Sequence, residues 1–317
     1  MSNKVSVIMS IYNEREEWIK GAVDSILNQT FSDFEFIIIN DNPQKEQNKI
    51  VLENYQAKDK RIRIIENEEN IGLTKSLNKA LKITRGEYIA RMDADDISFP
   101  KRFEKQIEFL DRNPDYIVCG AYVKHFGESK RLLKFGQDWQ KLKANFLIPN
   151  PTSSPIAHPV AMIRHRVLQE NNIYYNEEYA VGQDYELWSR LLFEGKFYNI
   201  QEPLLHYRVS REQISSKQKN KQLSVIKRVA PTFIRKYLQN LDTSIDLSSL
   251  DNIVKESKRN KRKRELKSFL VSVIGFELIY NKSFSKRALF FFLSQKDICI
   301  RTKVLVLYNL KNNLKKI

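Results

Sequence analysis

Residues 88–96 read Tyr-Ile-Ala-Arg-Met-Asp-Ala-Asp-Asp, an apolar run that ends directly in three carboxylates. Such a short run after Gly86 favours a buried β-strand. Carboxylates this close repel one another unless a cation lies among them. Oxygen ligands suit Mg²⁺ or Mn²⁺, which usually bridge to a substrate phosphate. A second interpretation is that Asp96 or Ser98 caps a helix opened by Pro100. The two interpretations are compatible.

Three similar apolar runs precede this stretch, over residues 5–11, 34–39 and 62–65. Apolar residues at helical spacing lie between them, which predicts strands alternating with helices. That alternation predicts an α/β fold with a mostly parallel sheet flanked by helices. Ligands of such sheets bind beyond the carboxyl ends of the strands. We therefore expect one crevice formed by the polar residues at those ends: Asn13, Glu14, Asp41, Asn67, Asn70 and the acids of 93–96.

The rest of the chain divides into two parts. Residues 117–126 and 159–163 read as strands, residues 185–193 as a helix, and residues 197–209 as paired strands around Pro203. After residue 211 the pattern changes to long helices, one of which we expect to begin at Pro231.

Charge separates the same two parts. The 317-residue chain has a formal charge of +16. Residues 1–210 hold 29 Lys+Arg and 30 Asp+Glu, whereas residues 211–317 hold 25 and 8. The whole excess of positive charge therefore lies in the last third, which excludes a uniformly basic nucleic-acid binder. We predict a first domain over 1–210 and a basic helical region over 211–317. Only two cysteines are present, which excludes a disulfide framework.

Three single residues leave two interpretations open. Asp184 precedes an amphipathic helix and is either a general base or a helix N-cap. Asp41 is either a nucleotide contact or a turn residue. His158 is either a ligand contact or a structural histidine. Neither a Gly-x-Gly-x-x-Gly motif nor a Walker-type Gly-Lys-Ser/Thr motif is present, which argues against dinucleotide and P-loop chemistry.

Taken together, these stretches resemble glycosyltransferase family 2, and in particular bacterial enzymes that build capsule, exopolysaccharide or O-antigen. The resemblance covers about 210 residues in a fixed order, which makes it specific. It rests on residues 5–14, 39–41, 70–73, Asn78, 86–96, Pro100, Arg102, 158–159, 183–188 and 207–208.

The resemblance implies a GT-A fold, a nucleotide-diphosphate sugar donor (a UDP-sugar), Mn²⁺ or Mg²⁺, and inversion at the anomeric carbon. It also implies a role for each matching position. Donor-binding residues would be Ile11, Tyr12 and Glu14 around the base, Asp41 on uracil, and Asn70, Asp93, Ala94 and Asp95. Asp95 and Asp93 would hold the metal, and Asp184 would deprotonate the acceptor hydroxyl.

The sequence departs from the family pattern at two places. Asp41 is followed by Asn-Pro-Gln rather than Gly-Ser, and Ser210 stands where many relatives carry a metal- or diphosphate-binding histidine. Arg208 or Arg211 would then serve as the diphosphate clamp. His158 is a further candidate contact to the diphosphate or the acceptor.

The basic third holds clusters such as 255–267 beside apolar stretches. No stretch reaches the ~20 apolar residues that span a bilayer. Basic clusters beside amphipathic helices suit an anionic membrane surface. We expect a peripheral protein at the cytoplasmic face of the cell membrane, with a saccharide acceptor linked to polyprenyl diphosphate. The alternative is a helical domain with a solvated basic face. No nucleic-acid partner is expected, because no aromatic stacking platform accompanies the basic residues.

Two other functions remain. A sugar nucleotidyltransferase could use a similar sheet and similar carboxylates, but it would need a Gly- and basic-rich loop after the first strand. Residues 13–17 read Asn-Glu-Arg-Glu-Glu instead. A non-catalytic nucleotide-sugar-binding module would need neither Asp95 nor Asp184.

Overall fold

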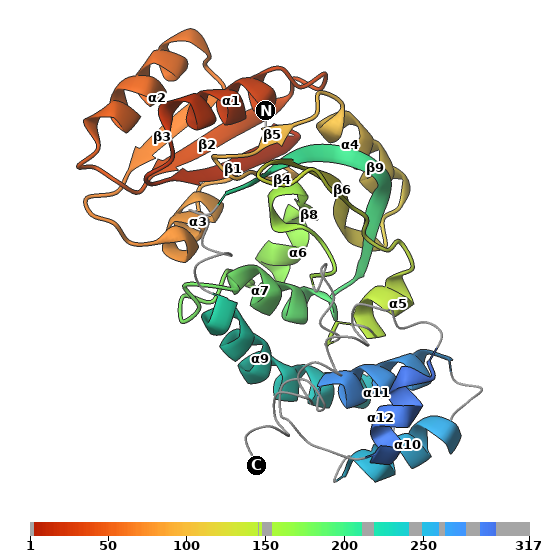
Figure 1. Ribbon diagram of the computed structural model, residues 1–317. Coiled ribbons are helices and arrows are strands. Elements are labelled where there is room, and N and C mark those ends of the chain that lie inside the picture. Colours follow the sequence, from red (N-terminus) through yellow and green to blue (C-terminus); the bar gives the residue numbers. More distant parts are fainter. Residues whose placement is uncertain are drawn as a thin grey trace. The chain divides into compact units, whose positions relative to one another are not determined.

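The computed structural model describes residues 3–144, 146–147, 154–210, 219–240, 249–259, 264–276 and 286–295. The chain forms two compact units. The first unit comprises Met1–Gln137 and Ile156–Lys219, and the second comprises Asp138–Pro155 and Asn220–Ile317. Their elements are labelled in Figure 1.

The first unit holds every described strand. The strands are β1 (Val5–Ile11), β2 (Phe34–Asn40), β3 (Ile62–Glu66), β4 (Tyr88–Arg91), β5 (Ile97–Ser98), β6 (Tyr116–Gly127), β7 (Leu132–Leu133), β8 (Met162–Arg164) and β9 (Lys196–Val209). Its helices are α1 (Glu16–Leu27), α2 (Glu46–Lys58), α3 (Leu73–Leu81), α4 (Arg102–Arg112), the 3₁₀ turn η1 (His158–Val160), α6 (His165–Glu170) and α7 (Gln183–Leu191).

The strands form one sheet in the order β3-β2-β1-β4-β8-β6-β9-β5, with β7 paired to β6. The first four strands are parallel, and β8 continues the sheet antiparallel to β4. The chain moves outward from β1 to β3 and then returns to the other side of β1 as β4. Right-handed crossovers therefore place α1 and α2 on one face and α3 on the other, as Figure 1 shows. The predicted α/β class is confirmed.

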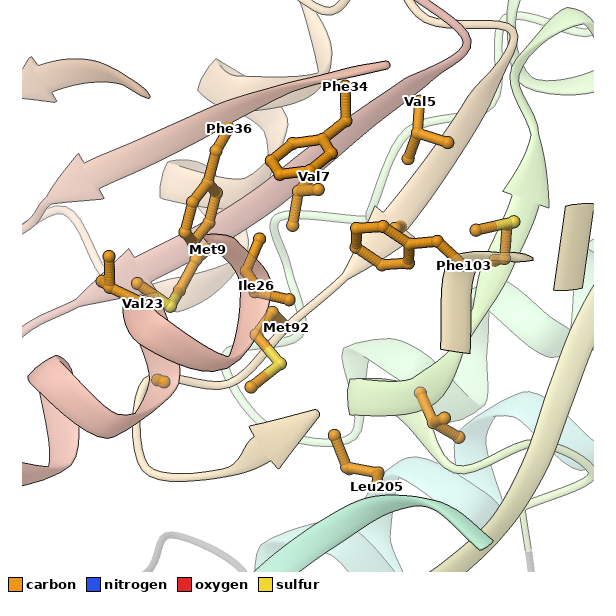
Figure 2. Packing of buried hydrophobic residues seen from close by; sticks show 14 of the residues in the cluster. Val5, Val7, Met9, Val23, Ile26, Phe34, Phe36, Met92, Phe103 and Leu205 are labelled. Carbon is orange, nitrogen blue, oxygen red and sulfur yellow. The ribbon is translucent and has the colours of Figure 1, made fainter. Parts of the chain in front are cut away.

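Alternate residues of β1 supply the core on one face of the sheet. Val5, Val7 and Met9 are fully buried against α1 residues such as Val23 and Ile26, and Figure 2 shows this packing. The same cluster includes Met92, which directly precedes the acids of 93–96. Packing of Met92 and the β1 side chains in this core thus fixes the position of the acids that follow Met92.

Two sequence expectations about the first unit were wrong. Residues 159–163 do not form one strand: η1 occupies His158–Val160, and β8 begins only at Met162. Residues 197–209 form the single strand β9 rather than a pair. The register of β9 against β6 shifts near Pro203, because proline supplies no N–H to the ladder and is accommodated at such irregularities.

The second unit joins an insertion to the C-terminal helices. The insertion carries α5 (Trp139–Ala144), and the other helices are α9 (Lys219–Asn240), α10 (Leu250–Arg259), α11 (Arg264–Phe276) and α12 (Lys286–Leu293). The ring of Phe146 packs 4.6 Å from that of Phe233, and Tyr237 stacks on Phe269 at 3.9 Å. Ala144, Phe146 and Leu147 are buried, although no local pattern in the sequence indicates that this segment joins the helices. The assignment of separate functions to 1–210 and 211–317 stays a prediction.

Pro231 does not begin a helix, contrary to expectation, but lies inside α9. Proline there removes one helical hydrogen bond and bends the helix. Val229, Ala230 and Phe233 are buried on either side of it. Packing of these apolar neighbours offsets the local cost of the proline.

The second unit includes the insertion 138–155 as well as the C-terminal helices, so a single truncation of the chain does not separate the two units. We predict that a chain ending at residue 219 aggregates, because it exposes the apolar side chains of 144–147 that the C-terminal helices cover. Removing 220–317 together with 138–155, joined by a short Gly/Ser linker, should restore a folded first unit. Soluble yield and a cooperative thermal transition measure both outcomes. A chain ending at 219 that melts as cooperatively as the doubly deleted chain would contradict this prediction.

Candidate active site

The candidate residues meet where the strand order reverses, between β1 and β4. Open α/β sheets bind ligands outside the carboxyl ends of the strands at such a point. Tyr12 follows β1 directly, and Asp93 lies two residues beyond the end of β4. Asp41 follows β2, the other neighbour of β1. The predicted convergence of strand-end residues is therefore consistent with the topology.

Asp41 organises a loop. Its carboxylate is 2% exposed and accepts hydrogen bonds from Asn67 Nδ2 at 2.8 Å and from the backbone N–H groups of Ile71 and Gly72, both at 2.9 Å. Gly72, which precedes α3, has a φ of +85°, a conformation that favours glycine. Asn70 Oδ1 also accepts from the Gly72 N–H. Contact of Asp41 and Asn70 with the donor stays a prediction.

The loop after β1 presents an aromatic ring on a fixed backbone. The N–H of Tyr12 donates to Glu14 Oε2 at 2.7 Å, and its carbonyl accepts from Asn48 Nδ2 at 2.9 Å. The Tyr12 side chain is nevertheless 45% exposed, whereas Ile11 is buried. An exposed ring on a backbone held in this way offers a surface on which a planar base can stack. Burial raises the pKa of Glu14, and repulsion from Asp93 adds to this rise, so the two acids lie close.

The acids of 93–96 have three different environments. Arg91 Nη2 donates to Asp93 Oδ1 at 2.5 Å. Asp96 is fully buried and accepts from the backbone N–H of Arg208 at 2.7 Å. Burial, followed by repulsion from Asp95 and Asp93, raises the pKa of Asp96 well above its ordinary value. The helix-cap interpretation is wrong, because α4 begins at Arg102 without a side-chain cap.

Arg208 holds this loop from the end of β9. Its Nε donates to the carbonyl of Asp95 at 2.8 Å. Its guanidinium lies over the rings of Trp18 and Phe126, at 4.5 and 4.3 Å. These contacts position the carboxylates; a contact of Arg208 with a diphosphate stays a prediction. Arg211 lies outside the described residues.

Two buried arginines support the loop, and sequence reasoning gave neither a role. Arg91 is 1% exposed, and its Nε and Nη1 have no hydrogen-bond partner in the described part of the protein. Arg102 is fully buried and donates through Nη2 to the Arg91 carbonyl at 2.7 Å. Burial, followed by repulsion from Arg91, lowers the pKa of Arg102 to about 9. A signal was present in the sequence for Arg91, which interrupts the apolar run 88–92 directly before the acids.

A divalent cation fits these residues in part. No group of three His, Cys, Asp or Glu side chains in the described ranges could hold a metal ion by itself. Mg²⁺ and Mn²⁺, however, commonly use one or two carboxylates and take further ligands from substrate phosphates. Repulsion of Asp96 by Asp95 and Asp93 indicates excess negative charge that a cation would relieve. Asp95 and Asp93 are therefore suitable ligands for a cation that also binds a diphosphate.

Asp184 lies in the first turn of α7. Gly182, with a φ of +68°, occupies the N-cap position, so the N-cap interpretation of Asp184 is wrong. Burial raises the pKa of Asp184. Hydrogen bonds from the backbone N–H groups of Tyr185 and Asp184 itself oppose this rise, repulsion from Asp93 adds to it, and attraction to Arg91 reduces it. The candidate base therefore interacts electrostatically with Asp93 and with Arg91, the residue that pairs with Asp93.

His158 is engaged by a tyrosine that sequence reasoning missed. Its Nε2 lies 2.7 Å from the hydroxyl of Tyr175, and both side chains are buried. Burial, reinforced by the Arg91 charge, lowers the pKa of His158 well below its ordinary value. The imidazole is therefore neutral and poorly suited to neutralise a diphosphate. Tyr175 also interacts electrostatically with Asp184 and Asp93, which places it at the edge of the same site.

Comparison with known proteins identifies relatives. The model named Glycosyl transferase family 2 matches residues 6–171. The "Uncharacterized glycosyltransferase MJ1057" of Methanocaldococcus jannaschii is 39% identical over 69% of this chain and 76% of its own length. The "O-antigen biosynthesis glycosyltransferase WbnJ" of Escherichia coli is 34% identical over 65% and 79%. The "Amylovoran biosynthesis glycosyltransferase AmsE" of Erwinia amylovora is 29% identical over 67% and 79%.

Two solved structures share the fold. S. aureus TarS 1–349 in complex with UDP-GlcNAc has a TM-score of 0.59 at 16% identity, covering 89% of this chain and 93% of that one. The mannosyltransferase PcManGT of Pyrobaculum calidifontis, in complex with GDP-Man and Mn²⁺, has a TM-score of 0.57 at 15% identity, covering 99% and 81%. These likenesses confirm the predicted GT-A fold.

The buried carboxylate of Asp41 generates a prediction about stability. Asp41→Ala removes the buried acceptor of three hydrogen bonds, so we expect the free energy of unfolding to fall by about 3 kcal/mol. Asp59 is a matched control, because it accepts from Arg61 in a more exposed turn. Asp59→Ala should cost no more than about 1 kcal/mol. Urea denaturation measures both losses, and equal losses would contradict an organising role for Asp41.

Proposed function

The chain belongs to glycosyltransferase family 2, and we propose that it transfers a sugar from a nucleotide-diphosphate sugar, a UDP-sugar, to a saccharide acceptor with inversion of configuration. The observation that carries the proposal is that Asp184, in the first turn of α7, interacts electrostatically with Asp93, which follows β4. One group of carboxylates then faces the donor, and a separate carboxylate is free to activate the acceptor.

Donor binding is supported by the loop geometry at the ends of β1 and β2. The exposed ring of Tyr12, bordered by Ile11 and Glu14, is suited to the base. The loop that Asp41 holds, including Asn70, would lie beside it. The similar TarS and PcManGT structures contain UDP-GlcNAc and GDP-Man, and the choice of uridine is part of the proposal.

Asp95, with Asp93, would hold a Mn²⁺ or Mg²⁺ ion together with the donor diphosphate. Such a cation neutralises the negative charge that develops on the departing diphosphate. Arg91 pairs with the Asp93 carboxylate and orients it, and Ala94, which separates the two acids in the sequence, is buried. Arg208 holds the Asp95 carbonyl, so that the loop is already formed when the donor arrives.

Asp184 acts as the general base of a single displacement. Its carboxylate takes the proton of the acceptor hydroxyl while that oxygen forms a bond to the anomeric carbon. The bond between the anomeric carbon and the diphosphate oxygen breaks, and the nucleoside diphosphate leaves with the electron pair. Because the acceptor attacks the face opposite the leaving group, the configuration of the anomeric carbon inverts.

Two alternative functions are less well supported. A nucleotidyltransferase would need a loop rich in glycine and basic side chains after β1. In this loop, Glu14 accepts from the Tyr12 N–H, and Asn48 donates to the Tyr12 carbonyl. A non-catalytic binding module would have no use for a carboxylate with a raised pKa beside Asp93. The rate lost on substitution of that residue therefore discriminates among the three functions.

The acceptor is proposed to be a saccharide on a lipid carrier, polyprenyl diphosphate, at the cytoplasmic face of an anionic membrane. Two of the named relatives, WbnJ and AmsE, act in O-antigen and amylovoran biosynthesis, and the basic last third of the chain supports attraction to anionic lipid. Among the described residues, no helix is long and apolar enough to cross a bilayer. The described apolar side chains of α10 and α11 are buried within the second unit, so the attraction would be electrostatic.

Asp184→Asn tests the base. A panel of UDP- and GDP-sugars with Mn²⁺ would identify the nucleotide sugar that the wild-type chain turns over fastest, by release of the nucleoside diphosphate. We expect the substitution to lower kcat by 10²- to 10⁴-fold. The base must be ionised, and its pKa is raised. Wild-type activity should therefore fall as the pH drops through a value above the ordinary aspartate pKa. Full activity in Asp184→Asn would exclude the proposed base.

Flotation with liposomes tests the membrane partner. Glutamine in place of the six Lys and Arg residues within 258–264 removes six positive charges from the full-length chain. At about 1 kcal/mol for each charge near the surface, partition onto vesicles rich in anionic lipid should fall by more than a hundredfold. Vesicles of neutral lipid provide the baseline. Equal flotation of both chains on anionic vesicles would reject the electrostatic attraction.

A further inference from the structure

Helix α3 contacts both parts of the site. Its N-terminal end is fixed by Asp41, which accepts the N–H of Gly72 at 2.9 Å. Its side chains reach the segment that leads into α7 and Asp184. In Figure 1, α3 follows the loop after β3 and lies on the face of the sheet opposite α1 and α2. Asn78, which belongs to the family resemblance, has no role in the chemistry described above.

Asn78 clamps the backbone of Tyr175. Its Oδ1 accepts the Tyr175 N–H at 2.9 Å, and its Nδ2 donates to the Tyr175 carbonyl at 2.9 Å. The same Nδ2 donates to Glu177 Oε1 at 3.0 Å. One turn earlier, Thr74 Oγ1 donates to the carbonyl of Tyr179 at 2.7 Å. Asn78 and Thr74 are both 4% exposed, so loss of either side chain leaves a buried partner unpaired.

Residues 171–182 between α6 and α7 form no helix or strand. The segment is held by turn bonds such as that from the Tyr179 N–H to the Asn176 carbonyl and by Arg190 of α7, which donates to the Tyr174 carbonyl. Helix α3 adds the side-chain bonds to Tyr175 and Tyr179, which tie this segment to the sheet. The segment ends at Gly182, whose positive φ turns the chain into α7, and Asp184 follows two residues later. A shift of the segment therefore moves the start of α7 and the carboxylate of Asp184 with it.

We propose that Asn78 and Thr74 are positioning residues for Asp184, and that α3 sets the base relative to the loop that Asp41 organises. This inference rests on the proposed function, in which Asp184 is the general base. Neither residue needs to touch donor or acceptor. A displacement of a reacting group by about 1 Å costs on the order of a hundredfold in rate, so the clamp is expected to control kcat rather than donor binding.

Kinetics of matched variants test the proposal on the full-length chain. The substrate is the nucleotide sugar that the wild-type chain turns over fastest, and its nucleoside diphosphate is the binding probe. Asn78→Ala and Thr74→Val should each lower kcat at least tenfold, with the donor KM and the Kd of the probe changed less than about twofold. Thr74→Ser keeps the hydroxyl and should retain wild-type kcat.

Asn113→Ala is the control for stability. Asn113 Nδ2 donates to the carbonyl of Phe109 at the end of α4, a side-chain-to-backbone bond of the same kind without a connection to α7. Its thermal transition should fall while kcat stays at the wild-type value. If Asn78→Ala likewise lowered the transition without lowering kcat, or if it weakened probe binding as much as kcat, the positioning role would be overturned.

A double-mutant cycle separates action through Asp184 from a general defect. In the Asp184→Asn background, Asn78→Ala should lower kcat by less than about twofold, because the group that it positions is already absent. A full tenfold loss in that background would overturn the proposal. Absence of turnover by the wild-type chain with every nucleotide sugar would instead reject the proposed function. If the wild-type chain turns over a nucleotide sugar and Asn78→Ala leaves kcat unchanged, only this inference is rejected.

Discussion

The buried guanidinium of Arg91, paired with Asp93 at the end of β4, is the interaction on which the arrangement of the site depends. A guanidinium removed from water is stabilised by carboxylates around it, and the loop over 93–96 supplies these carboxylates. Burial raises the pKa of Asp96 and of Asp184, and attraction to Arg91 offsets part of both rises. The neighbouring Arg102 bonds the Arg91 carbonyl, so the strand end and its carboxylates are held from both sides.

The remaining contacts extend this arrangement in two directions. Toward the ends of β1 and β2, Asp41 and Asn48 use buried hydrogen bonds to fix the loops that would receive a nucleotide. Toward α7, Asn78 fixes the segment that leads to Asp184. Donor and acceptor sides are therefore built from polar contacts between elements distant in sequence, while the apolar core below them fixes only the strand ends.

This division explains what the sequence could predict. The apolar runs and helical spacings indicated β1 to β4 and the helices between them, because local periodicity reports which face is buried. The family resemblance indicated the fold and named Asp93, Asp95 and Asp184. Arg91 received no role, because its local pattern does not by itself show that its side chain is buried. Tyr175 and Asn78 received none, since they bond across 97 positions of the chain. The insertion over 138–155 was missed for the same reason. No local periodicity marks its apolar side chains, and only packing against the C-terminal helices shows why they are there.

The central claim is a single displacement at the anomeric carbon, assisted by Asp184 from the face opposite the diphosphate. The stereochemistry of the product tests it most directly. The anomeric configuration of the first glycoside formed should be determined by NMR spectroscopy, with the donor configuration known. This account predicts a product whose anomeric configuration is opposite to that of the donor. A product that retains the donor configuration would contradict it.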